Sequence, residues 1–203
     1  MSETTKPVTE ESNFLSIFRL KAIKRIESNM KHLTRPAARN LCLIENDAVY
    51  ASYTLLNDTW AGGLFSKIDI QKGELLCEYI GKILTAKEAT ESTSEYLFSV
   101  RDPDDLRRKK VIDGDPNKSE NIAAYANYSD NVNANAMFLD QTKRKGVCKI
   151  VLISKEFIPA GIEIRVDYDM GSSVNPFRDF MIQNGIYDSS VNYKETVWAR
   201  PTT

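Results

Sequence analysis

The order of apolar and polar positions divides the chain into a helical N-terminal part and a β-rich remainder. Residues 1–12 are polar and have no periodicity, so we expect them to form a disordered tail. Over residues 13–40, apolar side chains recur mostly three, four or seven positions apart, which predicts an amphipathic helix that ends at Pro36. Residues 19–39 contain seven basic side chains and one acidic side chain, a local charge of +6. We therefore expect a helix with one basic face, whose apolar face packs on the main body of the protein.

From residue 41 to residue 170 the pattern changes to short segments rich in β-branched and aromatic residues, separated by turn signals such as Asn57-Asp58 and Asp113-Gly114. The composition changes again over residues 171–203, where a helical pattern returns. The sequence thus predicts an α+β, β-rich domain with a helical flank at each end. The predicted strands are 49–55, 63–66, 75–83, 96–100, 148–154 and 162–166.

Few segments between these strands have helical character. Thr85 is followed three positions later by Glu88, which is the spacing of a capping box and predicts a short helix that extends to Glu91. Residues 121–127 are a second short candidate. The run 101–110 is nearly all charged, and we expect it to be an exposed loop between two strands.

Composition limits the class of protein. A length of 203 residues with 42% apolar residues fits one domain with flanks, and no apolar stretch is long enough for a membrane span. We expect an intracellular protein of the nucleus or cytoplasm. Three widely spaced cysteines and a single histidine, His32, predict neither a disulfide framework nor a metal site. The net charge of -1 leaves nucleic-acid binding open, since only the predicted N-terminal helix is strongly basic.

Three segments carry candidate chemistry. Residues 60–65 contain a glycine pair, Gly62-Gly63, which by itself favours a tight turn, with close approach of another group to the backbone as the alternative. Residues 121–136 hold five asparagines, a composition that predicts either an irregular loop or a backbone folded around a polar ligand. Residues 157–169 combine a turn, a strand and then Tyr168 between two aspartates.

In this order, the three segments resemble the SET-domain family of protein lysine methyltransferases. Residues 61–66 are similar to the family's G-x-G-[VL]-F motif, and I-x-x-G-E and E-Y-x-G sequences follow by residue 81. Residues 121–134 are similar to G-N-x-A-R-F-x-N-H-S-C-x-P-N, and residues 161–168 to G-E-E-L-x-x-D-Y. The resemblance covers about residues 49–169. It implies a SET-domain fold of several short sheets with a knot-like C-terminal segment.

The same resemblance implies transfer of a methyl group from S-adenosylmethionine to a lysine side chain of a protein, a histone tail being one candidate. It implies that Tyr168 is the catalytic residue, which orients the amine and the methyl donor. It also implies that the cofactor is bound by Trp60, Gly62, Gly63, Asn127 and Tyr128, and that the lysine channel is lined by Tyr96 and Val166. For Tyr96, a position in the core is an equal alternative.

The chain departs from the family's motifs at Ala61, Tyr128, Asp130 and Val132, which replace a glycine, a histidine, a cysteine and a proline. The flank 171–203 lacks zinc-binding cysteines, and its candidates for covering the adenine are Phe177, Tyr193 and Trp198. Two other functions stay open. One is a SET-like binding module that has lost catalysis, and the other is a contact with chromatin or nucleic acid through the basic helix.

Overall fold

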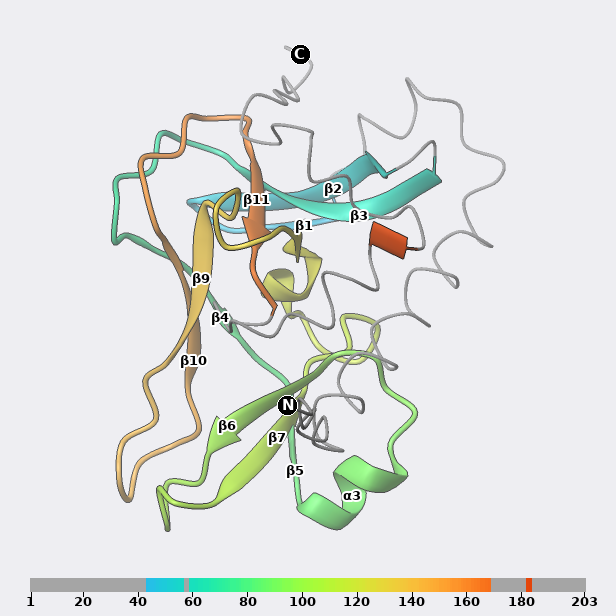
Figure 1. The fold of residues 1–203 in the computed structure, drawn as a ribbon, viewed down its shortest axis with the longest axis vertical. Helices are drawn as coiled ribbons and strands as arrows, with labels where there is room; N and C mark the ends of the chain where they lie inside the picture. Colours follow the sequence, from blue (N-terminus) through green and yellow to red (C-terminus); the bar gives the residue numbers. More distant parts are fainter. Residues whose placement is uncertain (1–42, 57–58, 169–181, 184–203) are drawn as a thin grey trace, which may run out of the picture.

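Most strands of the described part of the chain belong to one large sheet (Figure 1). The structure, a computed structural model, describes residues 43–56, 59–168 and 182–183. The large sheet has the strand order β1-β2-β3-β11-β9-β10-β4, with β8 paired to β11 beside this path. Its strands are β1 (Ile44–Glu45), β2 (Val49–Leu56), β3 (Thr59–Ser66), β4 (Leu75–Tyr79), β8 (Asn127–Tyr128), β9 (Ala136–Asp140), β10 (Ile150–Ser154) and β11 (Glu163–Val166).

A smaller sheet with the order β5-β7-β6 lies at the other end of the described region. It is formed by β5 (Lys82–Leu84), β6 (Leu97–Arg101) and β7 (Lys109–Asp113), all antiparallel. The helical elements of the described region outside residues 182–183 are short: α3 (Ala86–Glu91), and the 3-10 helix η1 (Ile122–Tyr125). The described part of the chain is thus strand-rich with few helices, as the sequence predicts.

Strand β11 joins segments that are far apart in the sequence. On one side it pairs antiparallel with β3, with Glu163 opposite Phe65 and Ile164 opposite Leu64. Farther along the same side it pairs in parallel with β8, and on its other side it pairs in parallel with β9. The three segments that carry the sequence motifs therefore lie side by side in one sheet, and Figure 1 shows β11 between β3 and β9.

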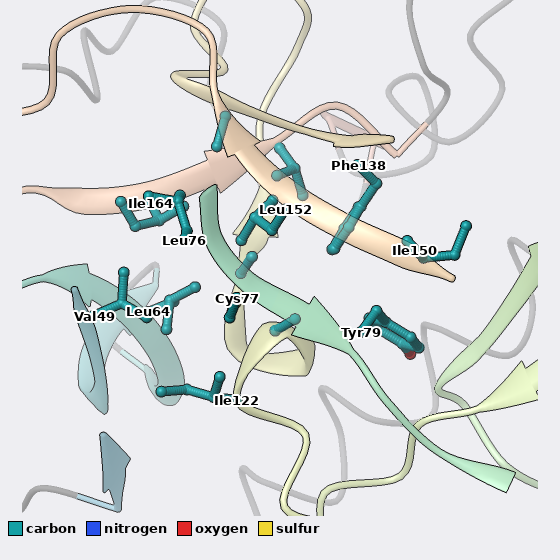
Figure 2. Packing of buried hydrophobic residues seen from close by; sticks show 14 of the residues in the cluster. Val49, Leu64, Leu76, Cys77, Tyr79, Ile122, Phe138, Ile150, Leu152 and Ile164 are labelled. Carbon is teal, nitrogen blue, oxygen red and sulfur yellow. The ribbon is translucent and has the colours of Figure 1, made fainter. Parts of the chain in front are cut away.

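The core lies where β4, β10 and β11 face β2, β3 and η1. Figure 2 shows Leu64, Leu76, Leu152 and Ile164 among its buried side chains. Three rings, those of Tyr79, Phe98 and Phe138, extend this core toward the smaller sheet, with centroids 5.0 to 5.6 Å apart. The two sheets are therefore joined by aromatic packing, and the position of β6 depends on the core.

Gly81 divides the predicted strand 75–83 into β4 and β5. A Cβ atom at this position would lie 2.1 Å from the carbonyl oxygen of Asp113. The chain can turn from the large sheet into the smaller one here because glycine permits this close approach of two backbones. A single continuous strand was therefore a wrong prediction at this point.

The prediction of an exposed loop over the charged run 101–110 was partly wrong. Arg101 ends β6, while Lys109 and Lys110 begin β7, so only the turn between them is outside the strands. Charged residues fit these strands because their side chains stay at least partly exposed: Lys110 lies 3.2 Å from Asp102, and Arg101 lies 3.0 Å from Asp140.

Several other strand predictions are confirmed. Strands β2, β6, β10 and β11 occupy the predicted segments to within two residues, and β3 begins four residues earlier than predicted. The predictions for residues 1–40, including His32, and for Phe177, Tyr193 and Trp198 in the C-terminal flank fall outside the described residues.

The predicted capping box of the short helix is confirmed. Thr85 is the N-cap of α3, its hydroxyl accepts a hydrogen bond from the Glu88 N–H, and the Glu88 carboxylate accepts one from the Thr85 N–H. The hydrogen bond from the Thr85 backbone, followed by that from Lys82, lowers the pKa of Glu88 from 4.5 to about 2. The ionised carboxylate therefore stabilises the folded state.

Because the folded pKa is lowered, this contribution is complete above pH 4.5 and disappears as the pH falls toward about 2. We expect Glu88→Gln to lower Tm near neutral pH and to have a shrinking effect over that acidic range, as measured by circular dichroism. Glu91→Gln at the last position of the same helix is the control. A Tm difference for Glu88→Gln that is the same at both ends of the range would contradict this account.

Candidate active site

The glycine pair lies inside a strand, and the prediction of a tight turn was wrong. Gly62 and Gly63 are opposite Tyr53 and Ser52 in the β2–β3 ladder. A Cβ atom on Gly62 would lie 2.6 Å from the ring of Tyr125 in η1. The alternative, close approach to the backbone, is therefore the correct interpretation, and the approaching group is an aromatic ring of the protein itself.

Asn127 connects all three motif segments through its side chain. Its Nδ2 donates hydrogen bonds to the carbonyl oxygen of Gly62 at 3.0 Å and to Oε1 of Glu163 at 2.8 Å. Its backbone lies opposite Arg165 in the parallel ladder between β8 and β11. The sequence grouped Asn127 with Gly62, and the structure brings these two residues into direct contact.

Tyr168 lies two residues after the end of β11 and points back toward η1 and β8. Its hydroxyl donates a hydrogen bond of 2.6 Å to the carbonyl oxygen of Ala126. Its ring packs against that of Tyr128, with centroids 5.5 Å apart. Tyr168, Asn127 and Tyr128 therefore form one continuous group at the end of β11.

Tyr96 precedes β6 and is mostly buried. Burial, and then the negative charges of Glu95 and Asp115, raise its pKa, and Tyr125 and Tyr168 add to this shift. The carbonyl oxygen of Tyr96 accepts a hydrogen bond of 2.8 Å from the Tyr79 hydroxyl. This hydrogen bond anchors the backbone of Tyr96 to a core residue of β4, and its role in lining a channel stays a prediction.

The remaining predicted site residues are placed as follows. Val166 is fully buried in the core, opposite Tyr128 and Ala136 in the ladders of β11. Trp60 lies in β3 opposite Leu55, two residues before Gly62. Their roles in a channel and in cofactor binding stay predictions.

Glu163, Arg165 and Tyr125 are additional residues of this region that the sequence reasoning did not single out. Arg165 Nη2 lies 2.7 Å from Glu163 Oε2, and both side chains are almost fully buried. The available signal was two charged residues, two positions apart, in an otherwise apolar strand. Such residues point to the same side of a strand and are seldom buried without a specific partner.

A cleft of about 460 Å³ lies beside η1. It is lined by Tyr125 and Asn121 of this region, by Leu43 and Ile44 near β1, and by the segment 116–120. Burial, followed by Tyr53 and Asp115, raises the pKa of Tyr125. The hydroxyl of Tyr125 is therefore protonated near neutral pH at the edge of this cleft.

The described residues contain no group of histidine, cysteine and acidic side chains arranged to hold a metal ion. Within the same part of the chain, no helix is long and apolar enough to cross a membrane.

Comparison with known proteins identifies the family. The SET domain model matches residues 62–169, more than half of the chain, and the chain therefore belongs to the SET-domain family, as the motifs predicted. This family includes protein lysine methyltransferases. The match begins at the glycine pair of β3 and ends just after Tyr168, so it covers the three segments that meet at β11 except for Trp60 and Ala61.

A relative in Plasmodium falciparum (isolate 3D7), the variant-silencing SET domain-containing protein, is 28% identical over 120 residues, which are 57% of this chain and 5% of the relative. The fold is similar to a chain in the crystal structure of the Chaetomium thermophilum polycomb repressive complex 2, with a TM-score of 0.50 and 21% identity. That similarity covers 66% of this chain and 16% of the other. The chain thus spans only a small part of both proteins.

The contact between Gly62 and Tyr125 can be tested by mutation. We expect Gly62→Ala to lower the free energy of unfolding by about 1–3 kcal/mol, because the added methyl group would force the Tyr125 ring to move. In a Tyr125→Ala background the same substitution should cost less, since the ring is absent. Urea unfolding of the four proteins in this cycle measures the coupling. Equal penalties in the two backgrounds would mean that another contact excludes the side chain.

Proposed function

We propose that the protein is a protein-lysine methyltransferase that uses S-adenosylmethionine. Membership of the SET-domain family supports this reaction class. The observation that carries the proposal is the meeting of Gly62, Asn127 and Tyr168 at the end of β11, through hydrogen bonds of Asn127 to Gly62 and of Tyr168 to Ala126. These are residues of the three motifs from which the function was predicted.

The polar groups beside β8 fit the amino-acid end of this cofactor. The carbonyl of Gly62 and the carboxylate of Glu163 both accept hydrogen bonds from Asn127 Nδ2. Oδ1 of the same amide group is therefore available to accept a hydrogen bond from an ammonium group. Ser129 Oγ is buried and has no hydrogen-bond partner in the described part of the chain, which makes it a second polar atom suited to a ligand or a water molecule. We propose that Trp60, Gly62 and Gly63 contribute backbone groups and that Tyr128 holds the adenine side through its backbone.

When bound, the cofactor supplies an electrophilic methyl group on a sulfonium ion. The protein must then align a lysine amine with that methyl group and favour the neutral amine. Burial among Tyr96, Tyr125 and Tyr168, together with the positive charge of the cofactor, would lower the pKa of the lysine. We assign Tyr168 the catalytic role of orienting the amine, and Tyr96 and Val166 the role of lining the channel.

The substrate in this proposal is a lysine side chain of a protein, with histone tails as the first candidates. The arrangement of β11 between β3 and β8 on one side and β9 on the other also supports the knot-like C-terminal segment implied by the family. A second candidate function is a SET-like module that binds the cofactor without transfer. Replacement of the family's histidine by Tyr128, whose ring packs against Tyr168, favours this alternative.

The proposal predicts measurable cofactor binding and methyl transfer. We expect calorimetric titration to detect binding of S-adenosylmethionine. We also expect an assay with radiolabelled cofactor to detect methyl transfer to lysine-containing peptides, among them histone tails. Tyr168→Phe should lower turnover by at least about tenfold and leave cofactor affinity unchanged, because it removes only the hydroxyl that orients the amine. The hydroxyl lost is the one bonded to Ala126.

Tyr50→Phe is the matched control, since Tyr50 stacks on Phe65 in the β2–β3 hairpin and lies outside the proposed machinery. It should keep full turnover. Cofactor binding without transfer to any peptide would favour the binding module, while equal turnover of Tyr168→Phe and the wild type would remove Tyr168 from its role.

A further inference from the structure

The strand β11 buries two opposite charges beside the proposed cofactor site. Glu163 and Arg165 are only 1% and 4% exposed. Arg165 donates from Nη2 and Nε to Oε2 of Glu163, at 2.7 and 3.2 Å. Removing two charges from water costs as much as their attraction returns, so a buried pair contributes little to stability compared with an apolar pair. Stability alone therefore does not explain why this charge pair is buried here.

The two oxygens of Glu163 have different partners. Oε2 accepts hydrogen bonds from Arg165 and, at 3.4 Å, from the Thr54 hydroxyl. Oε1 accepts the hydrogen bond from Asn127 Nδ2. Arg165 and Thr54 thus hold the carboxylate in an orientation that presents Oε1 to Asn127.

Arg165 is itself fixed in this position. Its Nη1 donates to the carbonyl oxygen of Tyr128 at 3.2 Å, and its backbone N–H donates to Oδ1 of Asn135 at 2.9 Å. Asn135 Nδ2 in turn donates to the backbone carbonyl of Glu163 at 2.8 Å. The charge pair is therefore tied to the strand β8 and to the segment before β9, and it has little freedom to rearrange.

The carboxamide of Asn127 faces two groups that can only accept hydrogen bonds. One is the carboxylate of Glu163 and the other is the carbonyl of Gly62. A carboxylate and a carbonyl both require a donor, so the NH₂ group must point at them. The reversed orientation would place Oδ1 against two acceptors, one of them charged. This orientation leaves Oδ1 as the acceptor that can serve a ligand.

We propose that Glu163 is a positioning residue that fixes the orientation of the Asn127 carboxamide, and that the site thereby selects ligands with an ammonium group over the corresponding nucleoside alone. This inference rests on the proposed function, because the ligand is the amino-acid end of S-adenosylmethionine. Glu163 acts through Asn127 and not on the ligand itself. Thr54 and Arg165 assist by keeping Oε1 directed at Asn127.

The variant Glu163→Gln tests the proposal, because a glutamine amide can also donate and so permits the Asn127 carboxamide to reverse. We expect its affinity for S-adenosylmethionine and S-adenosylhomocysteine to fall about tenfold, the value of one hydrogen bond to a charged group. Its affinity for methylthioadenosine, which lacks the ammonium group, should stay within about twofold of the wild type. Isothermal titration calorimetry with the three ligands measures this selectivity, which a general loss of stability would not change.

Glu163→Gln leaves the charge of Arg165 buried without a counter-charge, which destabilises the fold. The double variant Glu163→Gln/Arg165→Gln removes both charges, and we expect it to fold and to show the same loss of selectivity. Tyr50→Phe is the matched control, since Tyr50 stacks on Phe65 and has no part in the contacts that orient Glu163 and Asn127. It should keep the selectivity of the wild type.

The outcomes separate this inference from the proposed function. If the wild type does not bind S-adenosylmethionine, the proposed function and the inference both fail. If the wild type binds and the double variant loses affinity equally for ligands with and without the ammonium group, Glu163 has only a structural role and the inference alone is overturned. Unchanged affinity of the double variant for all three ligands would also overturn the inference alone.

Discussion

The site depends on the hydrogen bonds of one side chain, the carboxamide of Asn127. These bonds connect residues that are 65 and 36 positions away in the sequence, Gly62 and Glu163. Glu163 is almost fully buried, so its carboxylate needs donors from several directions. Asn127, Arg165 and Thr54 supply them. Because one buried acid requires these partners, the segments of β2, β3, β8 and β11 are held in one register at the place where a ligand is proposed to bind.

The aromatic side of the site depends on the core in a comparable way. The Tyr79 hydroxyl donates a hydrogen bond to the carbonyl of Tyr96. The ring of Tyr79 packs against Phe98 and Phe138 between the two sheets. Tyr168 is held from the other side by its hydrogen bond to Ala126. Burial raises the pKa of Tyr96, so its hydroxyl is neutral over the physiological range. For the proposed function, burial at such a site would disfavour the ammonium form of the substrate lysine.

Glycine has two different uses in this fold, and both serve the site. At Gly81 it allows the backbone of β4 to pass the carbonyl of Asp113 and enter the smaller sheet, which carries β6 after Tyr96. At Gly62 it allows the ring of Tyr125 to lie on β3. The glycine pair does not form the tight turn that its sequence suggested. At both positions the glycine is required by a group that is distant in the sequence, and the surrounding sequence does not identify that group.

The sequence alone determined the features that depend on nearby residues. Short segments rich in β-branched and aromatic residues between turn signals located most strands, the spacing of Thr85 and Glu88 located a capped helix, and the order of three motifs indicated the family. Only the tertiary structure decided that the glycine pair lies within β3, that Lys109 and Lys110 begin a strand, and that Glu163 and Arg165 are buried together. These outcomes rest on pairing between distant segments, in which the partner across the sheet decides whether a charge is satisfied and whether a side chain has room.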